Sequence, residues 1–345
     1  MFELNGRVIG RNSLPYVIAE ISANHDGSIQ RAKLAIKCAK AAGASAVKIQ
    51  TYTPDTMTID CDKSDFKVRE GLWKDYSLYE LYKEAYTPYE WHQELFEHAR
   101  KVGITLFSTP FDETAVDLLE SLNAPAYKIA SFELTDIPLI KLVARCKKPI
   151  FISTGMGTLD EIEEALDSVK GTGNNDVLLF HCVSSYPAPT EQSNLTNIIT
   201  LAKKFNVEVG LSDHSITNVA STVAVGLGAS AIEKHFKVDE STNGPDSSFS
   251  LTSEQLKILV KECNQAWLSI GKEEFARSEV EKSSKNYRRS IYFMRDLSAG
   301  MVVREVDIRS IRPGFGLPPK FFNEIVGKKL VKDIERGDPV DWDCF

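Results

Sequence analysis

The repeating unit of this chain is clearest in residues 207–235, which read VEVGLSDHSITNVASTVAVGLGASAIEKH. Two short apolar runs, 207–211 and 231–235, flank a segment with helical spacing, 219–227. Apolar runs of this length that end in polar side chains are typical of buried parallel strands, and the residues between them are enough for a crossover helix. This stretch therefore predicts a complete β/α unit.

The same unit recurs throughout residues 16–270, where short apolar runs alternate with amphipathic helical segments. Besides the two runs above, strands are predicted at 17–20, 46–50, 105–108, 126–129, 150–153 and 177–181. Eight β/α units in about 250 residues favour an α/β fold of the closed (β/α)₈ or TIM-barrel type. No GxGxxG turn follows a strand, which argues against an open doubly wound sheet.

The segments that flank the barrel region differ from it in pattern. Residues 1–15 carry Asn5-Gly6 between two short apolar runs, which predicts a hairpin that could cover the bottom of the barrel. Residues 271–288 are polar and charge-rich, as linkers are. Residues 289–345 combine β-like runs, among them 301–303, with Gly/Pro punctuation, which predicts a second, small domain.

The second β/α connection, residues 51–86, is far longer than the usual few residues and carries Trp73, Tyr76, Tyr79 and Tyr82. We expect it to lie over the end of the barrel where such enzymes build their active sites. The alternative is an insertion that only stabilises the fold.

Composition excludes several classes of protein. The 345 residues carry a formal net charge of −7, which disfavours nucleic acid and anionic membrane surfaces as partners. No run approaches the roughly 20 apolar residues of a membrane span, and the N-terminus lacks the apolar stretch of a signal peptide, so a cytoplasmic enzyme is predicted. The six cysteines are scattered without a CxxC pair and are predicted to be reduced and structural.

Polar side chains end almost every predicted strand. In a TIM barrel these positions converge on one mouth, and their convergence predicts an active site there. The side chains are Glu20, Lys48, Gln50, Ser108, Thr109, Lys128, Ser131, Glu133, Ser153, Thr154, His181, Tyr186, Ser212, Asp213, His214, Glu233, Lys234 and His235.

Two of these residues, His214 and His235, end consecutive strands. Neighbouring imidazoles suit an exchangeable divalent cation, Mn²⁺ or Mg²⁺, with open positions for water and substrate. A hydrogen-bonded histidine pair is the alternative.

Lys48 and Lys128 come from alternate strands and can face the same part of the mouth. Together with Ser131, Ser153 and Ser212 they would form a cradle for a phosphate and a carboxylate on one small substrate. The alternative is a pair of structural ion pairs with Glu20 and Glu133.

Nine segments resemble, in the same order, motifs of the sialic acid synthase family. They are Ile18–Gly27, Lys48–Thr51, Ser108–Asp112, Lys128–Glu133, Ser153–Met156, His181–Pro189, Gly210–His214, Glu233–Phe236 and Gly244–Asp246. The C-terminal segment resembles the small antifreeze-like (SAF) domain of these enzymes. The resemblance covers nearly the whole chain and implies a TIM barrel followed by a SAF domain.

Within the family, residues 72–92 and 244–250 most resemble pseudaminic acid synthases, and Ser184 stands where N-acetylneuraminate synthases typically have asparagine. The resemblance implies a metal-dependent condensation of phosphoenolpyruvate with a 2,4-diacetamido-2,4,6-trideoxy hexose, with C–O cleavage and release of phosphate. An N-acetylneuraminic or legionaminic acid synthase is the nearest alternative. The product would decorate flagellin or a surface polysaccharide.

The resemblance also implies roles for individual residues. The phosphate would be held by Lys128, Ser131, Ser153, Ser184 and Ser212, the carboxylate by Lys48 and Thr109, and the sugar by Glu20, Gln50, Tyr186 and Asp246. Arg312 would reach the sugar from the partner's small domain in a domain-swapped homodimer. Glu20 and Glu133 are the candidate catalytic carboxylates, and Glu133 would position or deprotonate the attacking water.

Two readings from other classes stay open beside this resemblance. A non-catalytic carbohydrate-binding protein would be expected to lack the lysines, Glu133 or the two histidines, and all are present. A barrel aldolase would form a Schiff base on Lys128 or Lys48.

Overall fold

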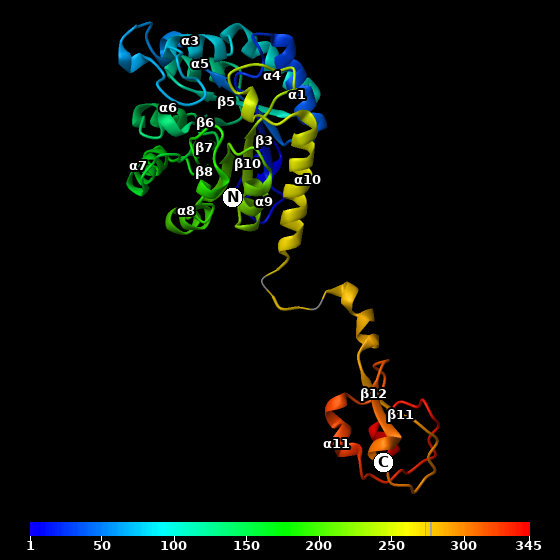
Figure 1. Ribbon diagram of the computed structural model, residues 1–345. Helices are drawn as coiled ribbons and strands as arrows, with labels where there is room; N and C mark the ends of the chain where they lie inside the picture. Colours follow the sequence, from blue (N-terminus) through cyan, green and yellow to red (C-terminus); the bar gives the residue numbers. More distant parts are fainter. Residues whose placement is uncertain (273, 277) are drawn as a thin grey trace. The chain divides into compact units, whose positions relative to one another are not determined.

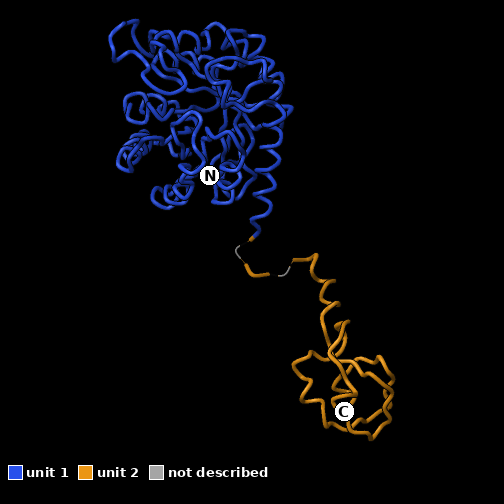
Figure 2. Tube along the Cα trace, in the orientation of Figure 1, with its two compact units in different colours: residues 1–271 blue, residues 272–345 orange. Residues whose placement is uncertain are grey.

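The computed structural model describes residues 1–272, 274–276 and 278–345. The chain divides into two compact units, Met1–Gly271 and Lys272–Phe345 (Figure 2).

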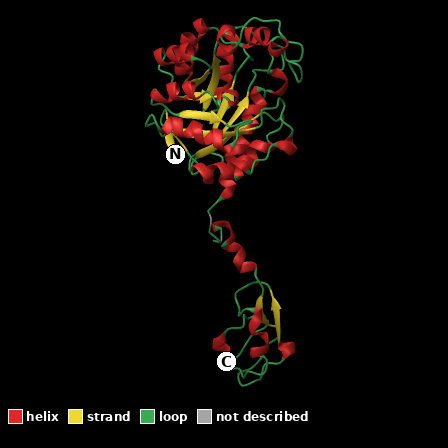
Figure 3. Cartoon of the chain, turned by 90° about the vertical axis from the view of Figure 1, so that its left-hand side faces the viewer, coloured by secondary structure: helices red, strands yellow, loops and turns green. Residues whose placement is uncertain are grey.

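The first unit is built on a closed barrel of parallel strands in the order β10-β3-β4-β5-β6-β7-β8-β9 (Figures 1 and 3). The strands are β3 (Tyr16–Glu20), β4 (Ala46–Thr51), β5 (Thr105–Pro110), β6 (Tyr127–Ile129), β7 (Ile150–Ser153), β8 (Val177–Cys182), β9 (Glu208–Asp213) and β10 (Ala231–His235). The predicted TIM barrel is confirmed.

Helices surround the strands on the outside (Figure 3). They are α1 (Ile29–Ala41), α4 (Tyr89–Val102), α5 (Glu113–Ser121), α6 (Ile137–Arg145), α7 (Leu159–Lys170), α8 (Asn197–Phe205), α9 (Val219–Gly226) and α10 (Ser253–Ile270), with short 3-10 turns η2 (Ser131–Glu133), η3 (Thr190–Gln192) and η4 (Ser247–Phe249) in the loops. In the part of the chain described, no helix is both long and apolar enough to cross a membrane.

Side chains alternate between two apolar layers along each strand, because successive strand residues point to opposite faces. One set, which includes Val47, Ile49 and Leu179, belongs to the main core cluster together with helix residues such as Ile36. The other set fills the barrel interior; its members include Ile18, Ala46, Phe107, Ala126, Phe151, Phe180 and Ala231. The barrel is therefore a packed core and not a pore.

A hairpin closes the lower end of this interior. Strands β1 (Phe2–Leu4) and β2 (Arg7–Ile9) pair antiparallel, and Phe2, Leu4 and Ile9 join the interior apolar cluster. The Phe2 ring packs edge-on against Phe151, with centroids 6.0 Å apart. Access to the barrel interior is consequently left to the C-terminal ends of the strands.

The long connection after β4 holds α2 (Pro54–Met57), η1 (Ser64–Phe66) and α3 (Leu78–Ala85). Both helices begin at a capping box, formed by Thr53 with Thr56 and by Ser77 with Glu80, so the connection carries its own helix-start signals.

The second unit has a core of its own, to which Ile291, Phe293 and Ile308 belong. Its elements are η5 (Glu279–Glu281), η6 (Ser283–Tyr287), β11 (Ser290–Phe293), η7 (Glu305–Asp307), β12 (Ile308–Ile311), η8 (Pro319–Phe321), α11 (Phe322–Ile325) and η9 (Trp342–Cys344). The β-like run at 301–303 was expected to form a strand; it makes only an isolated bridge, from Val302 to Lys329. Of the predicted linker, residues 273 and 277 lie outside the described residues.

Candidate active site

A layer of polar side chains lies directly above the apolar interior of the barrel. On most strands the polar residue follows the interior apolar residue by two positions, so it points to the same inner face. The pairs are Ile18 and Glu20, Ala46 and Lys48, Phe107 and Thr109, Ala126 and Lys128, Phe151 and Ser153, and Ala231 and Glu233. All six polar members are buried. Strand alternation thus brings the predicted residues Glu20, Lys48, Thr109, Lys128 and Ser153 together.

Four of these side chains form a buried charge cluster. Lys48 Nζ lies 2.5 Å from Glu20 Oε2 and 3.6 Å from Glu233 Oε2. Lys128 Nζ lies 3.3 Å from Glu233 Oε1, which also accepts a hydrogen bond of 3.0 Å from Ser212 Oγ. The Glu20 ion pair foreseen as the structural alternative is present, but the partner of Lys128 is Glu233 and not Glu133.

The pKa values of the two glutamates of the cluster are shifted in opposite directions. Burial raises the pKa of Glu20, and the attraction of Lys48 offsets only part of that shift. Burial also acts to raise the pKa of Glu233, but Lys128, Lys48 and the Ser212 hydroxyl together hold it below its usual range. Burial also lowers the pKa of Lys128; it acts to lower that of Lys48 too, but Glu20 and Glu233 raise the pKa of Lys48 overall. A cluster of two lysines in which Glu233 is the carboxylate held ionised suits an anionic ligand.

Glu233 is the functional residue that sequence reasoning missed. It stood among the strand-end polar residues, yet no role was assigned to it. The two-residue spacing predicts its position: Glu233 lies two positions before His235 on the same strand, so both side chains point to the same face of the sheet. Lys234, between them, points to the other side, where its Nζ lies 2.7 Å from Asp213 Oδ2.

A second cluster, of hydroxyl groups, surrounds Gly155 in the loop after β7. Gly155 N donates to Ser131 Oγ over 3.2 Å. A Cβ at Gly155 would overlap Ser184 Oγ and lie 2.7 Å from Ser131 Oγ, so only glycine leaves room for these groups to converge. Nearby in the barrel, Ser153 Oγ is buried and makes no hydrogen bond to any described residue. The Ser131 and Ser184 hydroxyls contact Cys182 Sγ, at 3.1 and 3.7 Å, so in the described part of the chain Ser153 Oγ is the unpartnered hydroxyl of the predicted phosphate cradle.

Glu133 ends the 3-10 turn η2, which starts at Ser131 of the cradle. Its Oε2 is buried and has no hydrogen-bond partner in the described chain. Burial raises the pKa of Glu133 to about 7. A carboxyl group with that pKa can exchange a proton near neutral pH.

The two predicted metal ligands lie side by side. The ring centroids of His214 and His235 are 5.4 Å apart. Burial lowers the pKa of both rings, so both are neutral, the form that binds metals. His214 Nδ1 donates to Val183 O over 3.0 Å, which leaves Nε2 as the lone-pair nitrogen. His235 Nδ1 lies 3.5 Å from Asp246 Oδ2 and makes no hydrogen bond within the described residues.

These donors fit an exchangeable cation better than a closed metal site. Residues 1–272, 274–276 and 278–345 contain no group of three or more His, Cys, Asp or Glu side chains that could hold a metal. Two imidazoles would leave most coordination positions to water and substrate oxygens, as the sequence predicted.

The predicted sugar residues divide between the two units. The Tyr186 ring packs against His214 at a tilt, with centroids 4.4 Å apart, and Asp246 faces His235, so both lie at the mouth. Gln50 is half-buried near the end of β4. Arg312 is exposed and belongs to the second unit, where it follows β12.

Two of the four predicted aromatics of the long connection lie near the mouth: Tyr82 packs on Tyr52 just after β4, with centroids 5.9 Å apart, and Trp73 contacts Tyr186. The Trp73 ring lies 5.5 Å from that of Tyr186, and Trp73 Nε1 donates to Pro245 O over 3.0 Å. Tyr76 and Tyr79 instead bond to Glu84 and Asp55 within the connection. The expected position of the connection over the catalytic face therefore holds for Trp73 and Tyr82.

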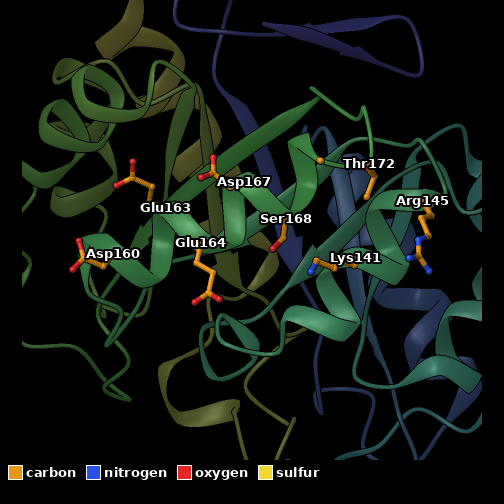
Figure 4. Close-up of a pocket in the computed structure, with 9 residues that line it drawn as sticks. Lys141, Arg145, Asp160, Glu163, Glu164, Asp167, Ser168 and Thr172 are labelled. Atoms are coloured by element: carbon orange, nitrogen blue, oxygen red, sulfur yellow. The ribbon is translucent and has the colours of Figure 1, made fainter.

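A separate groove of about 960 Å³ lies between α6 and α7 (Figure 4). Its charged lining residues are Lys141, Arg145, Asp160, Glu163, Glu164 and Asp167. None of the predicted site residues lines it, and its walls are helices that cover the outside of the barrel.

Comparison with known proteins identifies the family of the chain. The model of the NeuB family matches residues 35–275, and that of the SAF domain matches residues 288–345. The chain belongs to the NeuB family. The prediction of an enzyme of the sialic acid synthase type, with a TIM barrel and a C-terminal SAF domain, is thereby confirmed.

Relatives in the NeuB family span almost the whole chain. Pseudaminic acid synthase of Campylobacter jejuni strain 81-176 is 46% identical over 323 residues, 94% of each chain. N,N'-diacetyllegionaminic acid synthase of Legionella pneumophila is 38% identical over 97% of this chain and 95% of its own. The crystal structure of N-acetylneuraminic acid synthetase from Leptospira borgpetersenii superposes with a TM-score of 0.74 at 30% identity, covering 82% of this chain and 94% of that one.

Beneath the histidines, the fully buried Lys234 binds Asp213 and the carbonyls of Ser215 and Thr217. We expect Lys234→Met to lower the free energy of unfolding by about 3–5 kcal/mol, because Asp213 would remain as an uncompensated buried charge. The double variant Asp213→Leu/Lys234→Met should lose less. Urea denaturation measures the free energy of unfolding of the single and the double variant.

Lys204→Met is the control: it breaks only the surface pair with Glu163 and should cost under about 1 kcal/mol of the free energy of unfolding. An equally small loss for Lys234→Met would contradict the expectation.

Proposed function

We propose that this chain is a pseudaminic acid synthase that condenses phosphoenolpyruvate with 2,4-diacetamido-2,4,6-trideoxy-L-altrose and releases phosphate. The observation that carries the proposal is the convergence, at one barrel mouth, of a hydroxyl cradle, two buried lysines and a pair of neutral imidazoles. The choice of sugar is supported by the 46% identity to a pseudaminic acid synthase, against 38% to a legionaminic acid synthase.

The clusters match the two anionic groups of phosphoenolpyruvate. The phosphate would lie on Ser131, Ser153 and Ser184, whose hydroxyls surround or adjoin Gly155, with Lys128 and Ser212 beside them. The carboxylate would bind Lys48 Nζ and Thr109 Oγ1, which are 3.1 Å apart. A buried lysine holds an anion strongly, because little water competes for the charge.

The reaction forms one C–C bond and breaks one C–O bond. C3 of phosphoenolpyruvate attacks the aldehyde carbon of the open-chain sugar, which leaves positive character at C2. Water adds to C2; one of its protons neutralises the new alkoxide, and the other ends on the departing phosphate when the bond between C2 and the phosphate oxygen breaks and the C2 carbonyl forms. Glu133, beside the cradle, would orient this water and accept its proton. Glu20 would hold the sugar, and its easily neutralised carboxyl adds little repulsion toward the substrate anion.

His214 and His235 would hold a divalent cation, Mn²⁺ or Mg²⁺. When bound, such a cation supplies Lewis-acid polarisation of the sugar aldehyde. Tyr186 and Asp246 pack against these rings, so they would orient the sugar next to the same position.

We further propose that the enzyme is a cytoplasmic, domain-swapped homodimer. The second unit has its own core, and Arg312 is exposed at the end of β12. In the proposed dimer, Arg312 of one copy would contact an acetamido group of the sugar bound to the other copy.

The proposal is tested by phosphate release from phosphoenolpyruvate with a panel of sugars. We expect turnover with 2,4-diacetamido-2,4,6-trideoxy-L-altrose and little with the legionaminic acid precursor or N-acetylmannosamine. No lysine adduct should be trapped by borohydride, since no Schiff base forms. Turnover of N-acetylmannosamine alone would reject the proposal, and a trapped adduct would favour the aldolase reading.

The role of Glu133 predicts a pH dependence. Because its raised pKa is about 7, the carboxylate that accepts the proton is lost as the pH falls below 7, and kcat/KM should fall on that side. Glu133→Gln should lose about 10²–10⁴-fold in kcat and should lack this acid limb. Glu191→Gln, on the 3-10 turn η3, is the control and should keep the parent kcat and the acid limb of the pH profile. An unchanged acid limb in Glu133→Gln would assign the titration to another group.

Metal dependence is tested by chelation and by binding. We expect EDTA to abolish phosphate release and Mn²⁺ to restore it. His214→Ala and His235→Ala should each weaken Mn²⁺ binding, followed by electron paramagnetic resonance without substrates, by at least about tenfold. His98→Ala, on helix α4, should bind Mn²⁺ as the parent does. Full activity in both ligand variants would contradict the metal assignment.

A further inference from the structure

One side of the barrel mouth is a continuous aromatic surface. The Tyr186 ring lies 5.5 Å from Trp73 and 5.2 Å from Phe249, measured between centroids. The same ring contacts His214 at 4.4 Å, and Phe249 contacts His235 at 4.9 Å. We call Trp73, Tyr186 and Phe249 the aromatic wall. The wall therefore begins at the two imidazoles and extends outward to the long connection.

Trp73 is held in this wall from both sides. Its ring packs on Tyr186 in the loop after β8, and its Nε1 donates to Pro245 O in the loop after β10. Pro245 immediately precedes Asp246, whose carboxylate faces His235. The long connection thus contributes a side chain to the mouth at a fixed place, while Tyr76 and Tyr79 bond within the connection itself.

Because Phe249 is buried, the half-buried Trp73 and Tyr186 supply the carbon surface that a ligand can reach, and this surface has few polar groups. The single polar atom of Trp73 is already engaged by Pro245, Phe249 has none, and the Tyr186 hydroxyl is the one polar group that the wall can offer a ligand. A methyl or N-acetyl group can pack on such rings, whereas a hydroxyl buried against them loses its hydrogen bonds to water without replacement. An apolar surface of this kind discriminates between substrates by roughly 10–200-fold per group.

We propose that Trp73 is a specificity-determining residue, which selects sugars bearing methyl and acetamido groups over sugars with hydroxyls at the same positions. This inference rests on the proposed function and deepens it, because it gives a physical reason for a diacetamido-trideoxy substrate. It also gives the long connection a chemical purpose beyond stabilising the fold.

The test compares kcat/KM for 2,4-diacetamido-2,4,6-trideoxy-L-altrose and N-acetylmannosamine in the parent enzyme, Trp73→Ala and Trp73→Phe. In Trp73→Ala the ratio of the two values should fall by about tenfold, through a higher KM for the deoxy sugar. The KM for phosphoenolpyruvate should change less than about twofold, because the described contacts of Trp73 are with Tyr186 and Pro245 and not with the cradle serines. Trp73→Phe retains a ring and should retain most of the discrimination.

Trp267→Ala is the matched control. Trp267 is also half-buried, and its Nε1 also donates to a backbone carbonyl, Arg11 O, over 3.0 Å, but it lies on α10 away from the wall. The sugar ratio in this variant should equal that of the parent. Thermal denaturation checks that the variants are folded, and Trp73→Gln, of similar length, replaces Trp73→Ala if the latter is not.

The outcomes separate the inference from the proposed function. A parent enzyme that releases no phosphate with either sugar would reject the proposed function. A parent that prefers the deoxy sugar, with the same ratio in folded Trp73→Ala or Trp73→Gln, would leave the function intact and overturn the role of Trp73. An equal fall of the sugar ratio in Trp73→Ala and Trp267→Ala would also overturn the role of Trp73, since the effect would then come from lowered stability.

Discussion

The site depends on the electrostatic balance around Glu233. This carboxylate contacts both Lys48 and Lys128 across the barrel, and neither lysine could remain charged at that depth without an anionic partner. Glu233 holds the two ammonium groups near each other, although they repel. When an anionic substrate arrives, part of that compensation passes to the substrate, so the protein has in effect prepared a positive site in advance.

The buried charge cluster lies above an apolar layer that excludes water from the lower part of the barrel. The hairpin and the interior phenylalanines fill the lower end, so water reaches the charges only from the mouth. Low access of water strengthens the attraction between a lysine and an anion, and it also raises the pKa of Glu133 into the range useful for proton transfer. Binding and proton chemistry thus follow from the same packing.

The sequence predicts the fold, and it predicts most of the polar side chains that converge at the barrel mouth, for one physical reason: the patterns behind both repeat locally. The local pattern of each β/α unit predicts its own strand, and the ends of the strands converge in a closed barrel. What it missed was non-local. The pairing of Lys128 with Glu233 joins residues 105 positions apart, and Trp73 meets Pro245 across 172 positions. Local patterns mark such residues as polar or aromatic, but only the closed barrel decides which partner each one meets.

The hydroxyl cradle depends on a residue that has no side chain, Gly155. Gly155 contributes no functional side chain, yet Ser131 and Ser184 occupy the volume that its β-carbon would take. An alanine there, one of the mildest exchanges by chemical similarity, would overlap the Ser131 and Ser184 hydroxyls. Tolerance to substitution in this enzyme should therefore follow available volume more closely than chemical class, and surveys restricted to reactive side chains would overlook this position.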